Sequence, residues 1–359
     1  MTGPAAPDAQ YGGDVGAIED RARGALAGLA IGDALGMPTQ MLPRATVQRL
    51  FPKLSWFEAG PSENRISAGW QAGRVTDDTE QALILAKLLL EGRGHVDPPR
   101  FAAELAAWAQ QAEADGSEQL GPSSRRAIEA VAAGSPVEEA GRAGTTNGAA
   151  MRIAPVGIAT GPDDLTMLVD RVEEACLVTH HTGVAIAGAA AVAAAVSAGL
   201  AGLPPDEALG LACQAAEMGA ARGHYVAAPD VAQRIAWAAG LIQDVSQEVA
   251  ADLVAGLIGT GVATEQAVPA AFALAWRWPA DPWQACLTAA RLGGDADTIA
   301  AIAGAVGGAW AGAAAFPVAA LAVVEEVNGL GLADVAQRLL ALRDASGHTG
   351  PQSRAAAPA

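Results

Sequence analysis

Alanine-rich runs with helical spacing of the larger apolar residues recur through most of this chain. In residues 79–92 the apolar side chains fall three and four residues apart, which is the period of a helix with one buried face. No run of alternating β-branched residues predicts a strand. We therefore expect an all-α protein, a single domain of about a dozen helices. The predicted helices span residues 17–37, 79–92, 98–114, 123–134, 164–179, 183–200, 205–222, 228–243, 246–257, 264–276, 281–291, 297–315, 318–327 and 331–344.

The remaining segments lack this period. Residues 51–75 contain Pro, Gly, Ser, Asn and Trp and predict a loop whose length is uncommon unless the loop has a function. Residues 141–157 are glycine-rich and predicted to be irregular. Residues 1–16 have no apolar signal segment, and they and residues 346–359 are predicted to be loose tails. The expected helical domain therefore covers residues 17–345.

Two stretches are long enough to raise the question of a membrane. Residues 182–205 and 299–324 carry no charge, and each exceeds the roughly 18–20 residues that suggest a membrane-spanning helix. Both are dominated by alanine and glycine and lack flanking basic clusters, and Pro317 interrupts the second. We expect both to be buried core helices and no membrane partner.

The net charge and the cysteines exclude further classes of protein. The formal net charge is −17, with 39 acidic against 22 basic residues, which argues against nonspecific binding to nucleic acid or to anionic membranes. Cys176, Cys213 and Cys286 are scattered and odd in number, so they predict neither a disulfide framework nor a metal site. A reducing cytoplasm is the expected compartment.

Two acidic clusters precede long apolar runs. The first is Thr76-Asp77-Asp78-Thr79, and the second is residues 293–298, with the sequence Gly-Gly-Asp-Ala-Asp-Thr. Carboxylate and hydroxyl oxygens are the ligands that hard divalent cations prefer. If the fold brings the two helix starts together, they form an oxygen cage for a metal-dependent hydrolase.

The alternative for each cluster is helix capping. Thr76 could be the N-cap of one helix, with the following acids complementing the helix dipole. Asp295 or Asp297 could cap the other after the Gly-Gly turn. Capping does not require two adjacent acids, and two such clusters in one chain favour the metal interpretation.

Three further segments are weaker candidates for ligand-binding residues. Residues 144–152, with the sequence Gly-Thr-Thr-Asn-Gly-Ala-Ala-Met-Arg, could cradle a phosphate through backbone N–H groups or be a loop capped by Asn147. Arg152 could clamp a phosphate or pair with a carboxylate. His180 could contact a ligand, cap a helix or be a buried group with its hydrogen bonds satisfied. The Gly259-Thr260-Gly261 turn could line a pocket or simply join two helices.

Five motifs, taken in order, resemble the ADP-ribosylglycohydrolase family over about residues 20–345. They are Gly32-Asp33-Ala34-Leu35-Gly36, Thr76–Thr79, Asn147–Pro155, Thr179-His180 and Gly293–Thr298. The local sequences at residues 36–39 and 144–147 are most similar to those of a bacterial branch of the family, whose genes often lie beside genes for ribokinase-type sugar kinases. The resemblance implies an all-α orthogonal bundle with a dinuclear Mg²⁺ or Mn²⁺ site in a central cleft.

The resemblance also implies roles for particular residues. The implied metal ligands are Thr76, Asp77, Asp78, Asp295, Asp297 and Thr298. The implied substrate-binding residues are Asn147, Gly148, Ala149, Met151, Arg152, His180, Gly259 and Gly261. The family usually has a glutamate near the metals, and Gln40 stands in its place here. An amide cannot act as a general base, so proton abstraction would fall to Asp78 or Asp297.

The leading hypothesis is hydrolysis of the glycosidic bond at ribose C1 of a small-molecule or protein-linked ADP-ribosyl substrate, with two divalent cations as cofactors. A second hypothesis keeps the metal chemistry and makes the substrate a nucleoside or another small ribosyl compound. A third is a non-catalytic member that binds ADP-ribose, with Gln40 as the cause of the lost activity.

Overall fold

A computed structural model describes residues 15–114 and 119–347, and within these ranges the chain forms helices and no strand. The all-α prediction is confirmed. The helices are α1 (Val15–Gly36), α2 (Arg44–Leu50), α3 (Asp77–Glu91), α4 (Pro98–Ala114), α5 (Pro122–Ala132), α6 (Val137–Ala140), α7 (Gly148–Met151), α8 (Ala154–Ala159), α9 (Leu165–His180), α10 (Gly183–Leu200), α11 (Pro205–Ala220), α12 (Val231–Ile242), α13 (Gln247–Leu253), η1 (Val254–Ile258), α14 (Thr264–Arg277), α15 (Pro282–Ala290), α16 (Ala296–Ala311), η2 (Ala313–Ala315), α17 (Val318–Asn328) and α18 (Leu332–Gly347).

The differences from the predicted elements are small and local. The helices α2, α6, α7 and α8 fall in segments with no predicted helix, and α7 and α8 replace much of the irregular stretch expected at 141–157. Each has four to seven residues, too few to display a helical period in sequence. Residues 15–16 and 346–347, assigned to the tails, belong to α1 and α18. The rest of both predicted tails lies outside the described residues.

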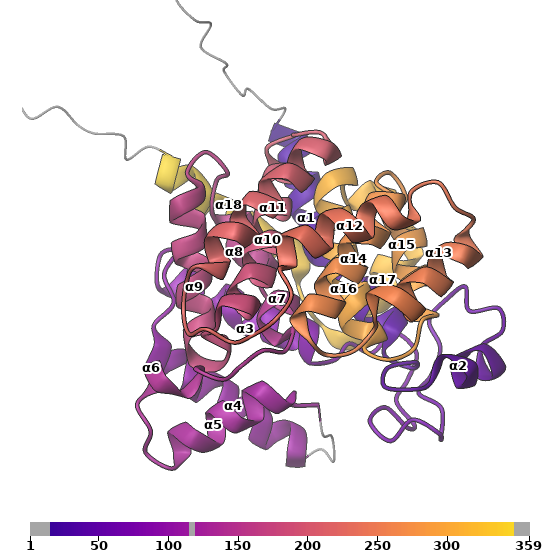
Figure 1. Cartoon of the computed structure of the whole chain (residues 1–359), viewed down its shortest axis with the longest axis horizontal. Helices are drawn as coiled ribbons and strands as arrows, with labels where there is room; N and C mark the ends of the chain where they lie inside the picture. Colours follow the sequence, from indigo (N-terminus) through magenta and orange to yellow (C-terminus); the bar gives the residue numbers. More distant parts are fainter. Residues whose placement is uncertain (1–14, 115–118, 348–359) are drawn as a thin grey trace, which may run out of the picture.

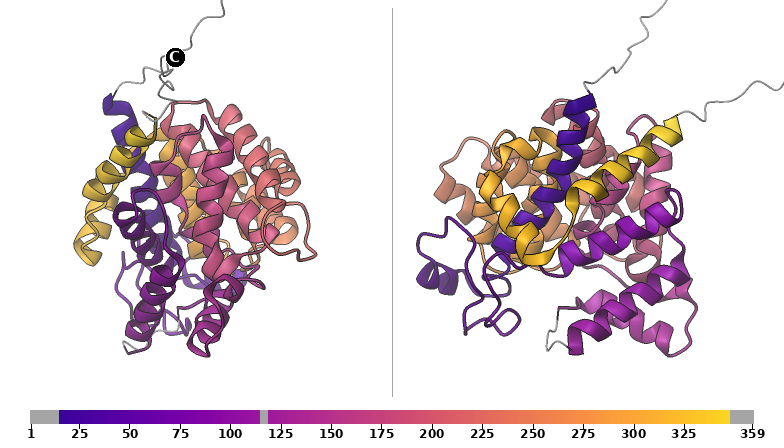
Figure 2. Two further views of the ribbon diagram at one scale, coloured as in Figure 1. Left: turned by 90° about the vertical axis from the view of Figure 1, so that its left-hand side faces the viewer. Right: turned by 180° about the vertical axis from the view of Figure 1, so that it is seen from behind.

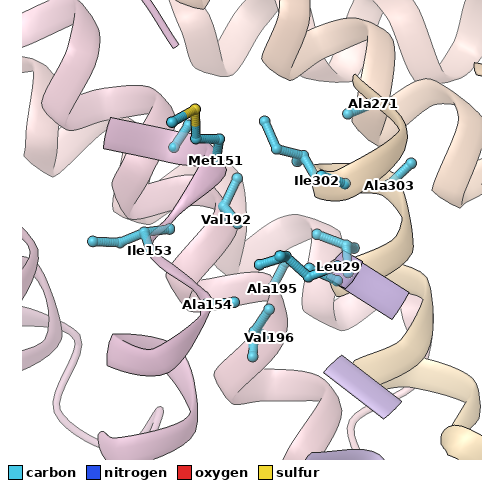
Figure 3. Close-up of a cluster of buried hydrophobic side chains, with 14 of the residues drawn as sticks. Leu29, Met151, Ile153, Ala154, Val192, Ala195, Val196, Ala271, Ile302 and Ala303 are labelled. Atoms are coloured by element: carbon cyan, nitrogen blue, oxygen red, sulfur yellow. The ribbon is translucent and has the colours of Figure 1, made fainter. Parts of the chain in front are cut away.

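The core is built around α10, whose residues are all buried. Figure 3 shows side chains of α10 and of neighbouring segments that meet in this core: Leu29, Met151, Ile153, Ala154, Val192, Ala195, Val196, Ala271, Ile302 and Ala303. By length and composition α10 could cross a membrane, but all of it lies inside the bundle. The prediction that this apolar run is a buried core helix is confirmed. The second run is divided among α16, η2 and α17. The prediction is confirmed for α16, which is buried along nearly its whole length, and is wrong for α17, in which Val318 is exposed and only Ala320 and Val324 are buried.

The two helices α1 and α16 are packed through their backbones. Gly24, Gly28 and Gly32 recur every four residues along one face of α1, and a Cβ atom at any of them would overlap the carbonyl oxygen of a residue in α16. The same face ends at Gly36, where a Cβ would overlap the backbone of Asp297. This close approach fixes the start of α16 against the end of α1.

Replacing Gly28 with alanine should lower the free energy of unfolding by about 3 kcal/mol, because an overpacked backbone contact forces the helices apart. Urea denaturation measures the change. The matched control is Gly240→Ala on α12, where an added Cβ meets nothing within 4 Å. That variant should gain up to about 1 kcal/mol from helix propensity. Equal unfolding midpoints for the two variants would contradict the close α1–α16 packing.

The remaining helices arrange themselves around this core. Figure 1 shows α4 and α5 at one side of the molecule, and Figure 2 shows α1 and α18 lying across the back. The start of α1 and the end of α18 lie at the same end of the bundle (Figure 1). The helices α3, α7 and α16 contact one another, so segments distant in sequence meet at one place. The two acidic clusters lie at the starts of α3 and α16.

Candidate functional site

The start of α3 is held by a carboxylate from another helix. Asp33 of α1 is fully buried and accepts hydrogen bonds from the backbone N–H groups of Thr76 at 2.9 Å and Thr79 at 3.1 Å. The Thr79 hydroxyl also donates to Asp33, at 2.6 Å. Thr76 occupies the N-cap position, but its side chain makes no capping hydrogen bond. Thr76 therefore stands at the N-cap position, as the capping alternative has it, but Asp33 rather than the Thr76 hydroxyl accepts the hydrogen bond from the Thr79 N–H.

The start of α16 depends on the two glycines before it. Gly293 and Gly294 have φ values of 70° and 65°, a left-handed conformation that favours glycine. A Cβ at Gly294 would also overlap the carbonyl oxygen of Thr260, which accepts a hydrogen bond from the Asp295 N–H at 2.7 Å. Asp295 is at the N-cap position and makes no side-chain capping bond. The Asp295 carboxylate is therefore not occupied in capping.

The structure brings the two clusters together. The Thr298 hydroxyl of α16 lies 3.4 Å from Oδ2 of Asp78 in α3, and the Thr76 hydroxyl donates to the same oxygen at 3.2 Å. The side-chain amide of Asn147 donates to the Asp295 carboxylate. The starts of α3 and α16 and the segment before α7 thus meet at one site.

The carboxylates at this site are poorly compensated within the protein. Oδ1 of Asp78 and Oδ1 of Asp297 are buried and have no hydrogen-bond partner. Burial, followed by the neighbouring carboxylates, raises the pKa of Asp77, Asp78 and Asp297 well above 3.8. Burial also raises the pKa of Asp295, to about 6, and hydrogen bonds from Asn147 and Thr298 oppose the shift.

These residues fit the chemistry of a hard divalent cation. Unpaired buried carboxylate oxygens are costly unless a positive charge or a donor faces them, and carboxylate and hydroxyl oxygens are the usual Mg²⁺ ligands. Across residues 15–114 and 119–347, no three His, Cys, Asp or Glu side chains are grouped so that they could hold an ion alone. A cation here would therefore also need threonine, water or substrate oxygens, which is common for Mg²⁺.

A cavity of about 170 Å³ opens at this site. It is lined by Gln40, Met41, Ile66, Asp77, Gln119, Leu120, Gly121, Pro122, Ser124, Thr146, Asn147, Gly148, Met151, Val262, Asp295, Asp297 and Thr298. Eight of the predicted site residues are therefore at the cavity: Gln40, Asp77, Asn147, Gly148, Met151, Asp295, Asp297 and Thr298. Thr76 and Asp78 lie buried behind them and join the site through the hydroxyl contacts of Asp78.

The other predicted substrate-binding residues lie outside this lining. Ala149 is part of the hydrophobic core. Arg152 and His180 are fully buried and hydrogen-bonded to other side chains. Gly259 and Gly261 lie in the turn before α14, next to Gln266, and only Val262 of that turn reaches the cavity.

Gln40 lies in the wall of the cavity. Its side chain is 5% exposed, and its Nε2 has no hydrogen-bond partner. Asn64 fixes the backbone at this point by donating to the Gln40 carbonyl at 2.9 Å. Asn64 belongs to the long loop 51–75, so this loop helps to form the wall that carries Gln40. The Gln40 amide is an unused donor facing the same cavity as Asp77 and Asp297.

Several residues at the site were not assigned roles from the sequence, and Asp33 and Thr146 are two of them. Asp33 is the acid in the Gly-Asp-Ala-Leu-Gly motif, and a carboxylate within an apolar helix was the available signal. Burial raises its pKa to about 6, and its hydrogen bonds with Thr76 and Thr79 oppose the shift. Thr146 stands beside Asn147 and lines the cavity, but its residue type alone does not distinguish it from Thr145.

Comparisons with known proteins show the family of this chain. The profile of the ADP-ribosylglycohydrolase family matches residues 14–349. The chain is 35% identical over 312 residues to the uncharacterized protein YegU of Escherichia coli (strain K12), covering 87% of this chain and 93% of that protein. Over 146 residues it is 32% identical to the ADP-ribosyl-[dinitrogen reductase] glycohydrolase of Rhodospirillum rubrum, covering 40% of this chain and 46% of that enzyme.

The fold has a counterpart among solved structures. An ADP-ribosylglycohydrolase-related protein complex contains a chain that superposes with a TM-score of 0.65 and 27% sequence identity, covering 91% of this chain and 99% of that one. The ordered motifs, the family profile and the fold therefore agree, and this chain belongs to the ADP-ribosylglycohydrolase family.

Proposed function

We propose that this protein hydrolyses the glycosidic bond at ribose C1 of an ADP-ribosylated substrate, with two divalent cations, Mg²⁺ or Mn²⁺, as cofactors. The observation that carries the proposal is the convergence of two acidic helix starts at one cavity, with unpartnered buried oxygens on Asp78 and Asp297. Membership of a family of glycosidase-type hydrolases supports the reaction class.

The residues that would hold the cations are Thr76, Asp77, Asp78, Asp295, Asp297 and Thr298. Bound there, the cations would act as Lewis acids toward the ribose hydroxyls and the attacking water. Asn147 orients the Asp295 carboxylate through its side-chain amide, and Asp33 fixes the first turn of α3. These two contacts position the ligand oxygens before a substrate arrives, which lowers the reorganisation needed during the reaction.

The chemical step requires a base and a stabilising charge. Asp297 or Asp78 would accept the proton of the attacking water, since Gln40 cannot. The carboxylates around the cavity would stabilise the positive charge that develops on the ribose as the bond at C1 breaks. Gln40 can still donate its unpartnered Nε2–H to a substrate or water oxygen, so it would orient rather than deprotonate.

The size of the cavity favours a second candidate substrate. A volume of about 170 Å³ lies below the roughly 300 Å³ at which pockets for drug-sized ligands begin. A ribosyl group would fill it, and the ADP part of a larger substrate would have to lie outside. A nucleoside or another small ribosyl compound would need no such extension.

The purified protein with Mg²⁺ should release ADP-ribose from an ADP-ribosylated arginine or serine peptide, as measured by liquid chromatography. The same assay with nucleosides tests the smaller substrate. Turnover of nucleosides alone would replace the leading proposal with the second. ADP-ribose binding without any turnover, and gain of turnover in Gln40→Glu, would indicate a non-catalytic member. Absence of both binding and turnover would overturn the proposal.

A further inference from the structure

Arg152 is the branch point of a buried chain of hydrogen bonds that begins and ends at the cavity. Its guanidinium is fully buried and lies over the ring of Phe101, 4.9 Å from the centroid. Nη1 donates to Oε1 of Gln81 at 2.9 Å, and Nη2 donates to the Thr179 hydroxyl at 2.6 Å. Packing alone does not account for this placement, because burying a charged guanidinium is costly unless hydrogen bonds or an opposite charge compensate it.

The first branch ends on a carboxylate of the site. Gln81 accepts from Arg152 through its carbonyl oxygen, so its amide nitrogen faces the other way and donates to Oδ2 of Asp77 at 3.3 Å. Asp77 lines the cavity. Arg152 thus fixes which end of the Gln81 amide meets Asp77.

The second branch passes through a histidine. The Thr179 hydroxyl accepts from Arg152 and lies 2.7 Å from Nδ1 of His180. A guanidinium only donates, and a hydroxyl has one proton and two lone pairs. Thr179 is fully buried, and among the described residues its hydroxyl contacts only Arg152 and Nδ1, so Nδ1 is the one acceptor for its proton. Burial, followed by the nearby Arg152 and Arg126, lowers the pKa of His180 well below 6.5, so the ring is neutral. Its proton must then be on Nε2.

The branch ends at a hydroxyl in the cavity wall. Nε2 of His180 lies 2.9 Å from the Thr146 hydroxyl, which therefore accepts the Nε2–H. Thr146 keeps its own proton to donate, and it lines the cavity beside Asn147. The direction of the bonds in this branch follows from two facts together: Arg152 cannot accept, and Nδ1 of His180 is the one acceptor within reach of the buried Thr179 hydroxyl.

We propose that Arg152 is a positioning residue whose buried hydrogen bonds through Thr179 and His180 make the Thr146 hydroxyl a donor to an acceptor oxygen of the ligand. The identity of that ligand rests on the proposed function, but the direction of the bonds does not. The motif residues Arg152 and His180 then act on the substrate through Thr146 rather than by contact.

The first test reads the histidine directly and needs no substrate. Nitrogen-15 NMR of the histidine-labelled protein at pH 7 should show His180 neutral, with Nε2 protonated and Nδ1 unprotonated. The resonance can be assigned through the contact of the ring with Gly148. Thr179→Val should produce a mixture of tautomers, and Thr179→Ser should retain the wild-type one. A wild-type ring protonated at Nδ1 would overturn the proposal.

The second test measures ADP-ribose binding by calorimetry. Thr146→Val should weaken binding about 10- to 100-fold, the loss expected for one hydrogen bond to a charged ligand, and Thr146→Ser should restore it. Thr179→Val should weaken binding less, and adding it to Thr146→Val should produce no further loss. Independent effects that multiply in the double variant, or unchanged binding in Thr146→Val, would contradict the proposal.

The two tests separate this inference from the proposed function. A wild-type protein that does not bind ADP-ribose but has His180 protonated at Nε2 would count against the proposed substrate and support the hydrogen-bond direction. A wild-type protein that binds ADP-ribose with His180 protonated at Nδ1 would support the proposed substrate and contradict the hydrogen-bond direction. Thermal unfolding of each variant shows whether a change in binding reflects a change in stability.

Discussion

Replacing Asp297 with asparagine should lower kcat/KM by about 1,000-fold or more, the range expected when a general base and charged ligand is lost. The variant keeps the size of the side chain at the first turn of α16 and removes the charge. Asp297 lines the cavity, and its Oδ1 has no partner within the protein. Steady-state hydrolysis of an ADP-ribosylated peptide measures the effect, with ADP-ribose release followed over time.

Stability separates a chemical role from a structural one. Because Asp297 is buried among other carboxylates, removing its charge should raise the free energy of unfolding of the metal-free protein. The matched control is Asp244→Asn, an exposed acid in the turn after α12 and outside the cavity lining, which should leave both activity and stability unchanged. An inactive Asp297→Asn variant that is also strongly destabilised would assign this residue to the fold.

The long helices could be predicted because their apolar residues repeat over several turns. The run at 183–200 is found at those bounds as α10, and 98–114 as α4. The close packing of α1 on α16 has a sequence signature in Gly24, Gly28 and Gly32, but the signature does not say which helix is the partner. That choice depends on the complementary small residues in α16, which only the fold brings into register.

The site was predictable at the level of its charged clusters and less so at single residues around α7. Asn147 and Gly148 reach the cavity, whereas Ala149 and Arg152 do not. In a helix, residues three apart share a face, so Gly148 and Met151 point to the cavity together and Ala149 and Arg152 point away together. Because α7 has four residues, its sequence does not reveal which of these faces is buried.

A motif shared with the family also does not show whether a residue contacts the substrate itself or holds another residue that does. Arg152 and His180 belong to motifs shared with the family, and both were assigned to the substrate. The structure places them inside the core, where they are bonded to Gln81, Thr179 and Thr146. A charged residue in such a motif can be retained because it orients the residues that make contact. Asp33 is a second example, since it holds the start of α3 from behind.

Metal removal should make stability strongly dependent on pH. In the metal-free protein, burial raises the pKa of Asp33 and of Asp295 to about 6, and that of Asp77, Asp78 and Asp297 well above 3.8. The folded state therefore binds more protons than the unfolded state once the pH exceeds about 4. The free energy of unfolding should fall as the pH rises from 4 through 6, and further as the more strongly shifted groups ionise. Thermal unfolding of EDTA-treated protein at pH 5 and pH 8 should show a lower Tm at pH 8.

Divalent cations should reverse the loss of stability at high pH. They bind the ionised carboxylates of the folded state and not the dispersed carboxylates of the unfolded chain. At pH 8, Mg²⁺ at about 100 times its Kd should recover about 2.7 kcal/mol for each ion bound, and calorimetry should count two ions per chain. Asp297→Asn should reduce both the fall in Tm with pH and the recovery with Mg²⁺, while Asp244→Asn should change neither. A Tm at pH 8 that is the same with EDTA, Mg²⁺ and Mn²⁺ would show that the carboxylates at α3 and α16 do not hold a cation. Recovery with one ion per chain would keep the site and reject its dinuclear form.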